Sequence, residues 1–200
     1  YQLFVRQFGT NNLPDCSNMC HESSGVALKE TIGIGKGTVK LSDFDLADLI
    51  MVMGQNPGTN HPRMLTALQS AVRNGAKIIH INPLPEAGLQ RFKHPQEVRG
   101  VLGKGTALAT LFLQVRINGD IALLKGIMKE LLAEEERTGK VFDKKFIAEH
   151  TTGFEQFIAD IKAESWELIV EQSGISREQI KAAADLIMQS NRMITCWAMG

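Results

Sequence analysis

The stretch that decides the fold is residues 48–88, which read DLIMVMGQNPGTNHPRMLTALQSAVRNGAKIIHINPLPEAG. It opens with a short continuous apolar run, Leu49 to Met53, that ends at Gly54. Such a run is typical of a strand buried on both faces. A second run of the same kind, KIIHIN, ends before Pro83. We therefore predict two buried strands in this stretch.

A helix is predicted between the two strands, and Gly75 follows it where a helix end favours glycine. Its apolar residues recur at helical spacing: Met64, Leu65, Leu68, Ala71 and Val72. Strand, helix and strand within about 35 residues form a βαβ unit. Such a unit pairs its strands in parallel through a right-handed crossover.

The rest of the chain is predicted to be mostly helical. One helix spans residues 121–136, and another opens at Ser176 with Gln179 three residues later, a capping-box pattern. Their apolar stripes are Ile121, Leu124, Ile127, Met128, Leu131 and Leu132 in the first, and Ile180, Ala183, Ala184, Ile187 and Met188 in the second. RMITCWAMG returns to strand character.

The predicted fold class is α/β, with a parallel sheet, a Rossmann-like βαβ unit, helices on both faces and a helix-rich second half. Residues 1–47 are expected to form an active-site loop segment that leads into the sheet. Residues 48–200 are expected to form a Rossmann-like cofactor-binding domain.

Composition excludes several classes of protein. Lys plus Arg and Asp plus Glu both number 22, so the formal net charge is zero and no nucleic-acid partner is expected. The apolar runs are too short to span a bilayer. Three cysteines, an odd number, favour a reducing compartment over a disulfide framework, so we expect a cytoplasmic location. Because the chain begins with Tyr1, we expect a piece of a longer protein.

Three loops are expected at one edge of the sheet, residues 54–62, 82–88 and 198–200, because ligands of such sheets bind beyond the carboxyl ends of the strands. In the first loop, glycines permit close backbone approach, Asn and Thr side chains offer hydrogen bonds, and the next helix begins. Asn82 ends the second strand, where a ribose would lie.

A further turn, residues 102–109, has two glycines and a threonine before an expected apolar helix. These features indicate a nucleotide-like ligand. The alternative is that all of these loops are ordinary turns.

The stretch DCSNMCHESSG, residues 15–25, places Cys16, Cys20 and His21 close together. A structural zinc site would need a second, separated pair of ligands, and Cys196 stands alone beside a tryptophan in a predicted strand, where a core role is expected. A disulfide between Cys16 and Cys20 is sterically possible. Two readings stay open: unremarkable loop cysteines, or one thiolate that binds a redox metal on an organic carrier beside a histidine that accepts protons.

Residues 19–83, from MCHESSG to HINP, resemble the molybdopterin oxidoreductases, in particular the formate dehydrogenase-like branch. The resemblance continues through HTTGFEQFIADI, SGISREQIKAAADLI and CWAMG and covers essentially the whole chain. It is closest to formate dehydrogenase-like alpha subunits of unassigned substrate. It implies a bis-molybdopterin guanine dinucleotide cofactor with molybdenum or tungsten.

The resemblance also implies roles for individual residues. Cys20 matches the metal ligand, and His21 matches the neighbouring catalytic histidine. The residues that match cofactor-binding segments are Gly54, Asn56, Pro57, Asn60 and His61 in the pyrophosphate loop, Asn82 and Pro83 in an Asp-Pro-Arg segment, Gly103, Gly105 and Thr106 in a Gly-Thr-Asp turn, and Met199 and Gly200 in a later glycine loop. The sequence departs from the family pattern at Asn82, at Leu84 and at Ala107, where the family usually has Asp, Arg and Asp.

The expected function is a two-electron oxidation or reduction of formate or another small substrate, with electrons passed to a partner. An iron–sulfur cluster in an upstream part of the longer protein is compatible with the resemblance, and this piece by itself is expected to be inactive. Two rivals remain open. One is a catalytically degenerate cofactor-binding protein, and the other is a simple guanine-nucleotide-binding module.

Overall fold

The structure is a computed structural model that describes residues 1–13, 20 and 22–197, without the side chain of Arg99. Cys16, His21, Met199 and Gly200, to which the sequence analysis gave roles, lie outside the described residues. The chain divides into two compact units, and we describe the parts Tyr1–Val39 and Lys40–Trp197 separately. The predicted division between residues 47 and 48 remains a prediction.

The described residues of the N-terminal unit include the helices α1 (Gln2–Gln7) and α3 (Glu22–Ile32). Its described residues include none that is fully buried. The chain after α3 packs back onto the helix, since a Cβ added to Gly35 would lie 2.9 Å from the carbonyl oxygen of Gly25. Glycine is therefore required at position 35 for this approach.

The second unit is built on a four-stranded parallel sheet in the order β5-β2-β1-β6, beside a small antiparallel pair, β3-β4. The strands are β1 (Leu49–Met53), β2 (Lys77–Ile81), β3 (Arg91–Phe92), β4 (Thr106–Ala107), β5 (Leu111–Leu113) and β6 (Met193–Trp197). The helices are the 3-10 helix η1 (Leu41–Asp45), α4 (Pro57–Asn60), α5 (Pro62–Arg73), α6 (Ala87–Gln90), α7 (Val98–Leu102), α8 (Asp120–Thr138), α9 (Lys144–His150), α10 (Phe154–Ala163), α11 (Trp166–Ser173) and α12 (Arg177–Met188).

The predicted βαβ unit is confirmed as β1-α5-β2. The two strands pair in parallel from Leu49 opposite Lys77 to Met53 opposite Ile81. Successive residues of β1 face opposite sides, so Met51 joins one core and Val52 the other. Both faces of the strand are therefore buried, as its unbroken apolar run indicated.

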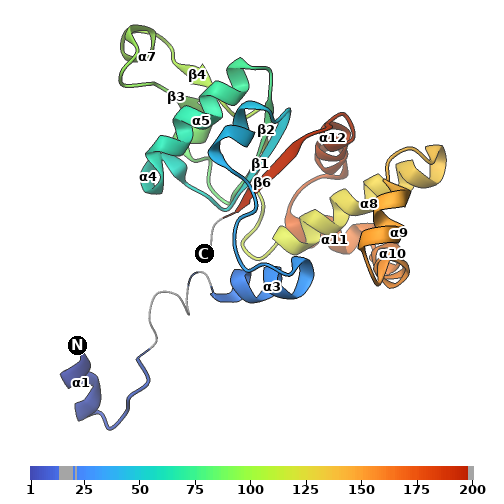
Figure 1. Cartoon of the computed structure of the whole chain (residues 1–200), viewed down its shortest axis with the longest axis horizontal. Coiled ribbons are helices and arrows are strands. Elements are labelled where there is room, and N and C mark those ends of the chain that lie inside the picture. The colour runs from blue at the N-terminus through green and yellow to red at the C-terminus, as the bar shows by residue number, and fades with distance from the viewer. Residues whose placement is uncertain (14–19, 21, 198–200) are drawn as a thin grey trace. The chain divides into compact units, whose positions relative to one another are not determined.

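Each face of the sheet is covered by helices (Figure 1). On one face, α5 contributes Leu65, Leu68 and Ala71 to a core with Ile50, Val52 and Ile78. On the other face, α8, α11 and α12 contribute Leu123, Ile127, Ile169, Ile180, Ala183 and Ala184 to a core with Leu49, Met51, Ile79 and Ile81. The predicted fold class is confirmed, including the helix-rich second half.

Local details of the helices agree with the sequence in part. The capping box of α12 is present: the Ser176 hydroxyl accepts from the backbone N–H of Gln179, and the Gln179 side chain accepts from the N–H of Ser176. In α8, however, Ile121 is 69% exposed although it was predicted on the buried stripe, whereas Leu123 is fully buried. Leu123 is buried because α8 packs against both α11 and α12, which widens its buried face beyond one stripe. This packing does not extend to Ile121, in the first turn of α8.

The segment before α8 differs from the prediction. The apolar helix expected after Thr106 is absent from the described chain, where β4 and β5 occupy that region. Gly105 has φ +73°, and a Cβ there would meet the carbonyl oxygen of Phe92 at 2.6 Å, so this turn is shaped by its pairing with β3. Long-range strand pairing has overridden the local pattern.

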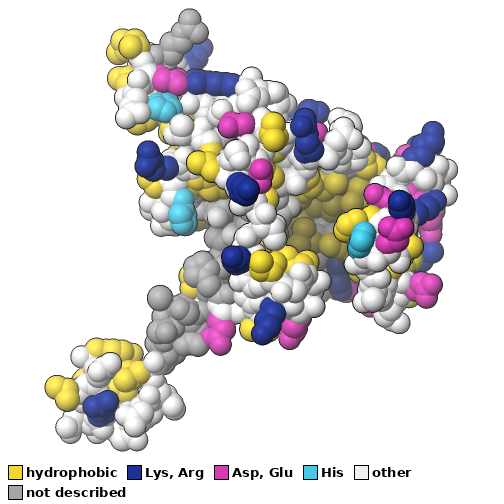
Figure 2. All heavy atoms as spheres, in the orientation of Figure 1, with side chains coloured by type: hydrophobic (Ala, Val, Ile, Leu, Met, Phe, Trp, Pro, Cys, Tyr) yellow, Lys and Arg dark blue, Asp and Glu magenta, His cyan; other side chains and the backbone are white. Residues whose placement is uncertain are grey.

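The surface of the described residues carries both signs of charge, mixed on the face seen in Figure 2. This distribution agrees with the balanced composition. None of the helices in the described chain has the length and apolar character needed to cross a membrane.

His80 lies fully buried in β2, with its ring centroid 4.8 Å from that of Phe112. Neither ring nitrogen has a hydrogen-bond partner among the described residues. Burial lowers the pKa of His80 from 6.5 to about 4, because the charged imidazolium would lose its hydration without gaining a partner.

We predict that His80 makes the fold sensitive to acid. Its pKa is depressed in the folded state, so its contribution to stability is complete above pH 6.5 and is lost as the pH falls from 6.5 toward 4. When the pH falls from 7 to 4.5, the wild type should lose stability through His80, and His80→Leu should not. The decrease in the free energy of unfolding should therefore be about 2.5 kcal/mol smaller in His80→Leu than in the wild type. Urea unfolding at both pH values tests this, with exposed His150→Leu as the control. An identical pH dependence in His80→Leu and the wild type would refute the prediction.

Candidate functional site

The carboxyl ends of the parallel strands lie at one edge of the sheet, and three described loops leave from it. We call these the edge loops: residues 54–61 after β1, 82–86 after β2 and 114–119 after β5. The first two were predicted. Residues 198–200, the predicted third loop with Met199 and Gly200, lie outside the described residues.

The first two edge loops are fastened to each other by hydrogen bonds around Asn82. The backbone N–H of Gly54 donates to the carbonyl oxygen of Ile81 (2.9 Å). The Asn82 side chain donates through Nδ2 to the carbonyl of Gln55 (3.2 Å) and accepts through Oδ1 from the N–H of Leu84 (3.2 Å). Asn82 is only 7% exposed, and its amide holds the loops together from within. Its predicted role in binding the cofactor remains a prediction.

The side-chain amide of Asn56 also forms hydrogen bonds within the protein at both of its ends. Its Oδ1 accepts from the backbone N–H of Thr59 (3.2 Å) and so caps α4. Its Nδ2 donates to Oε2 of Glu86 (2.5 Å), in the second edge loop. Both ends of this amide are therefore occupied within the protein, and Pro57 beside it is buried.

The first edge loop also packs closely against α6, which follows the second edge loop. A Cβ added to Gly88 would lie 3.1 Å from Cα of Gly58 and 3.2 Å from Cδ1 of Leu65. A Cβ added to Gly58 would lie 3.4 Å from Cα of Gly88. Gly88 is thus required where α6 packs against the first edge loop. Asn60 and His61 of that loop are exposed.

The sequence analysis missed the third edge loop. Gln114 donates through Nε2 to the carbonyl of Pro83 (3.0 Å), and the N–H of Asn82 donates to the carbonyl of Leu113 (3.2 Å), so this loop lies beside the second. Asn118 has φ +64°, and buried Gly119 precedes α8. The Asn118-Gly119 pair before a predicted helix indicates a turn. The strand that would place this turn at the sheet edge has only three residues, so the sequence did not predict it.

The turn with Gly103, Gly105 and Thr106 is not brought together with the edge loops. Thr106 Oγ1 accepts from Nε2 of Gln69 (2.8 Å), and Gln69 lies in the second half of α5, whose first turn follows the first edge loop. Figure 1 shows β3, β4 and α7 at one end of α5 and α4 at the other. The cofactor-binding role of these three residues remains a prediction.

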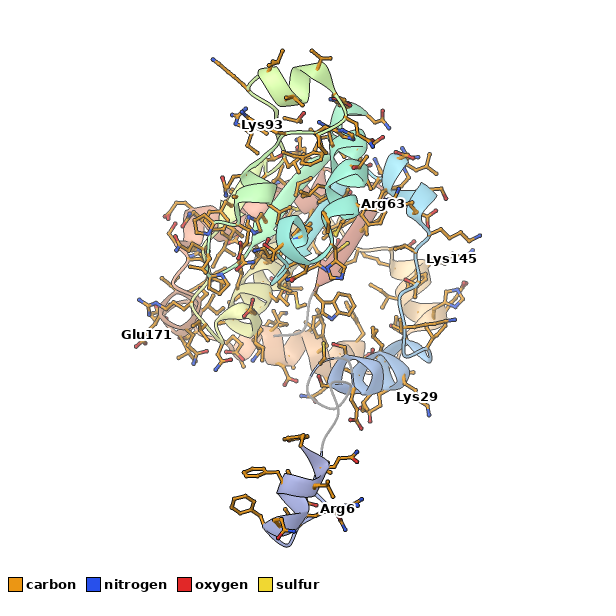
Figure 3. The ribbon with its side chains drawn as sticks, turned by 90° about the vertical axis from the view of Figure 1, so that its left-hand side faces the viewer. Arg6, Lys29, Arg63, Lys93, Lys145 and Glu171 are labelled. Atoms are coloured by element: carbon orange, nitrogen blue, oxygen red, sulfur yellow. The ribbon has the colours of Figure 1, made fainter. Side chains whose placement is uncertain are left out.

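The described cavities lie away from the edge loops. One of about 340 Å³ lies between α5 and the 103–106 turn, with the Arg73–Glu97 ion pair in its wall. Figure 3 shows Lys93, next to this turn, and Arg63, in the first turn of α5, at different ends of that helix. A larger cavity of about 960 Å³ lies among α8, α9 and α10, and its lysines are already paired: Lys144 with Glu135 and Lys162 with Glu136.

The two described cysteines have different surroundings. Cys20 is a half-buried free thiol two residues before α3. Cys196 lies in β6 against the core, and burial raises its pKa to about 11, which keeps the thiol protonated at neutral pH. The core role predicted for Cys196 agrees with this position. Within the described ranges, no three His, Cys, Asp or Glu side chains lie together as a metal site would require.

The edge loops have features that fit a nucleotide-like group. Oε1 of Gln55 is buried and has no hydrogen-bond partner in the described part of the chain, so it is an acceptor without a donor. Gly58 has no side chain and is exposed, so a ligand can approach its backbone closely. The twelve-residue helix α5 begins at this edge with its positive end.

Comparison with known proteins gives relatives along the whole chain, although no family model matches it. The chain is 54% identical to a protein of Mycobacterium tuberculosis named an uncharacterized oxidoreductase and 48% identical to Protein YdeP of Escherichia coli. It is 29% identical to formate dehydrogenase H of Escherichia coli over 200 residues. These matches cover 100% of this chain but only 26%, 27% and 25% of the three relatives.

A solved structure, acetylene hydratase from Pelobacter acetylenicus, shares the fold. Its TM-score is 0.71 at 20% identity, covering 98% of this chain and 24% of that one. The resemblance stated from the sequence is confirmed at the level of named oxidoreductases that include a formate dehydrogenase. This chain spans about a quarter of the length of these relatives.

Asn82→Asp should destabilise the protein by about 1–3 kcal/mol, because a buried carboxylate cannot donate to the carbonyl of Gln55 and would face it with a second oxygen. Urea unfolding at pH 7 measures the change. Asn60→Asp makes the same substitution at an exposed position of the first edge loop and should change stability little. Equal stabilities of the two variants would show that the Asn82 amide does not hold the loops together.

Proposed function

We propose that this chain is part of a molybdopterin-dependent oxidoreductase that transfers two electrons to or from formate or another small substrate. The observation that carries the proposal is the match to formate dehydrogenase H, which runs through the whole chain. Because the relatives are about four times as long, the activity is proposed for a longer protein that contains this chain. Its electrons would pass to a partner protein or a cluster outside these residues.

The edge loops are the proposed site for one guanine dinucleotide of the cofactor. The backbone N–H groups of Gln55, Asn56 and Gly58 and the N-terminus of α5 suit a pyrophosphate, since they offer donors and a positive helix end. Exposed Arg63 in the first turn of that helix adds a cation (Figure 3). Asn56 and Asn82 would act indirectly, by fixing the shape of the loops.

Cys20 is the proposed protein ligand of the metal, and His21 the proposed proton acceptor beside it. A thiolate suits a soft or redox-active metal, and a histidine titrates in the range needed to take a proton from a substrate near neutral pH. The bound metal and pterin would supply the redox chemistry, and the protein would supply placement and electrostatics.

Cys20→Ala in the longer protein should abolish turnover and lower the metal content, while the guanine nucleotide content stays largely intact. The reason is that only the thiolate contact is removed, whereas the dinucleotide keeps its contacts at the edge loops. Metal analysis, pterin and nucleotide extraction and dye-linked formate oxidation measure the three quantities. Cys16→Ala is the matched control, and its turnover, metal content and nucleotide content should stay close to those of the wild type.

Equal losses of metal and activity in Cys16→Ala and Cys20→Ala would point to a paired-cysteine site and contradict the assignment. A longer protein that carries guanine nucleotide but neither molybdenum, tungsten nor pterin would instead favour the nucleotide-binding module.

His21→Gln should lower turnover by about 10²–10⁴-fold without releasing metal, because it removes a proton acceptor and leaves the metal ligand in place. Turnover, its pH profile and metal content of the longer protein are the readouts. His150→Gln, which changes an exposed histidine of α9, serves as the control for a general effect of losing an imidazole. Unchanged turnover with an unchanged pH profile in His21→Gln would exclude a catalytic role.

A further inference from the structure

The second edge loop carries a carboxylate that the proposed function leaves without a role. Glu86 is half-buried and follows β2. Its Oε2 accepts from Nδ2 of Asn56 (2.5 Å), and its Oε1 has no hydrogen-bond partner in the described part of the chain. The ion pairs of the described residues do not include Glu86, so no lysine or arginine there neutralises its charge.

A second unsatisfied acceptor lies in the adjoining loop. Oε1 of Gln55 is buried without a partner, and Gln55 precedes Asn56, the residue that holds Glu86. The backbone carbonyl of Gln55 is fixed by Asn82, so the three residues belong to one hydrogen-bonded junction. This junction therefore contains two acceptors that have no matching donors among the described residues.

The chemistry of these groups selects the part of a ligand that they can bind. A half-buried carboxylate repels a phosphate, which carries negative charge and brings only acceptors at neutral pH. The cis-diol of a ribose brings two O–H donors, and an acid near the end of the second strand is the usual acceptor for ribose hydroxyls in βαβ nucleotide sites. Asn82, the residue at the expected ribose position, has both polar side-chain atoms occupied within the protein.

We propose that Glu86 is the ribose-recognising residue of this edge, accepting a hydrogen bond from the cis-diol of a guanosine nucleotide, with Gln55 as the second acceptor. The inference rests on the proposed function, because it assumes that a guanine nucleotide binds at the edge loops. Asn56 positions Glu86 by engaging Oε2, which leaves Oε1 for the ligand. The phosphates would then lie on the side of the α5 N-terminus, away from the carboxylate.

The test compares GDP with 2′,3′-dideoxy-GDP by calorimetric titration of the chain. The wild type should bind GDP about 10- to 100-fold more tightly than the dideoxy nucleotide, because hydrogen bonds to a charged acceptor are lost with the hydroxyls. Glu86→Gln should bind both nucleotides with equal affinity, close to that of the wild type for dideoxy-GDP. Glu167→Gln, which changes an exposed glutamate of α11, should keep the full preference.

Each outcome separates the inference from the function on which it rests. If the wild type binds both nucleotides equally, the ribose assignment is wrong while nucleotide binding stands. If Glu86→Gln keeps the preference of the wild type, the hydroxyls are recognised by another residue and the assignment to Glu86 is overturned. If the chain binds neither nucleotide, both the inference and the proposed dinucleotide site fail. The wild-type comparison needs no variant, so it holds even if Glu86→Gln is unstable.

Discussion

The parallel pairing of β1 with β2 is the constraint on which the rest of the structure depends. Its five residue pairs lie in the centre of the sheet and are covered by helices on both faces. A shift by one residue would turn Met51 and Val52 toward the wrong cores, so the register is strongly determined. That register also sets which loop residues meet, since it places Gly54 beside Ile81 and Asn82 beside Gln55.

The polar side chains at the carboxyl edge fall into two groups, which differ in whether their hydrogen-bonding atoms have partners within the described chain. Asn56 and Asn82 are neutral, and their hydrogen bonds are used within the protein to cap a helix and to join two loops. Glu86 and Gln55 each keep an acceptor without a partner in the described chain. A buried acceptor without a partner, such as Oε1 of Gln55, is costly in a structural role and useful in a binding site. We infer that the first group shapes the edge and the second meets the ligand.

The sequence predicts the centre of this fold well because its signals there are strong and local. The apolar runs at β1 and β2 and the capping box at Ser176 correspond to elements of the structure. The three-residue strand β5 was not predicted, since a run so short has no readable period. Without β5, the edge loop that carries Asn118 could not be placed.

The candidate site is predicted from sequence only in outline, because the role of a side chain depends on its tertiary partners. Asn82 was expected at a ribose, but the carbonyl of Gln55 and the N–H of Leu84 occupy its amide. The Gly105–Thr106 turn has the composition of a phosphate loop, yet its partners are Phe92 and Gln69. Composition shows that a segment can turn tightly, whereas only the fold shows which surface it faces.

The measurement that tests the account most directly is an amide NMR map of the chain titrated with GDP. The account predicts that shift changes concentrate in the edge loops, residues 54–61, 82–86 and 114–119, because these segments share the carboxyl edge of the sheet. Amides of the turn beside Gln69, including Gly105 and Thr106, should then move little. Changes centred on that turn, or on α9 and α10, with the edge loops unaffected, would contradict the assignment of the site to the carboxyl edge.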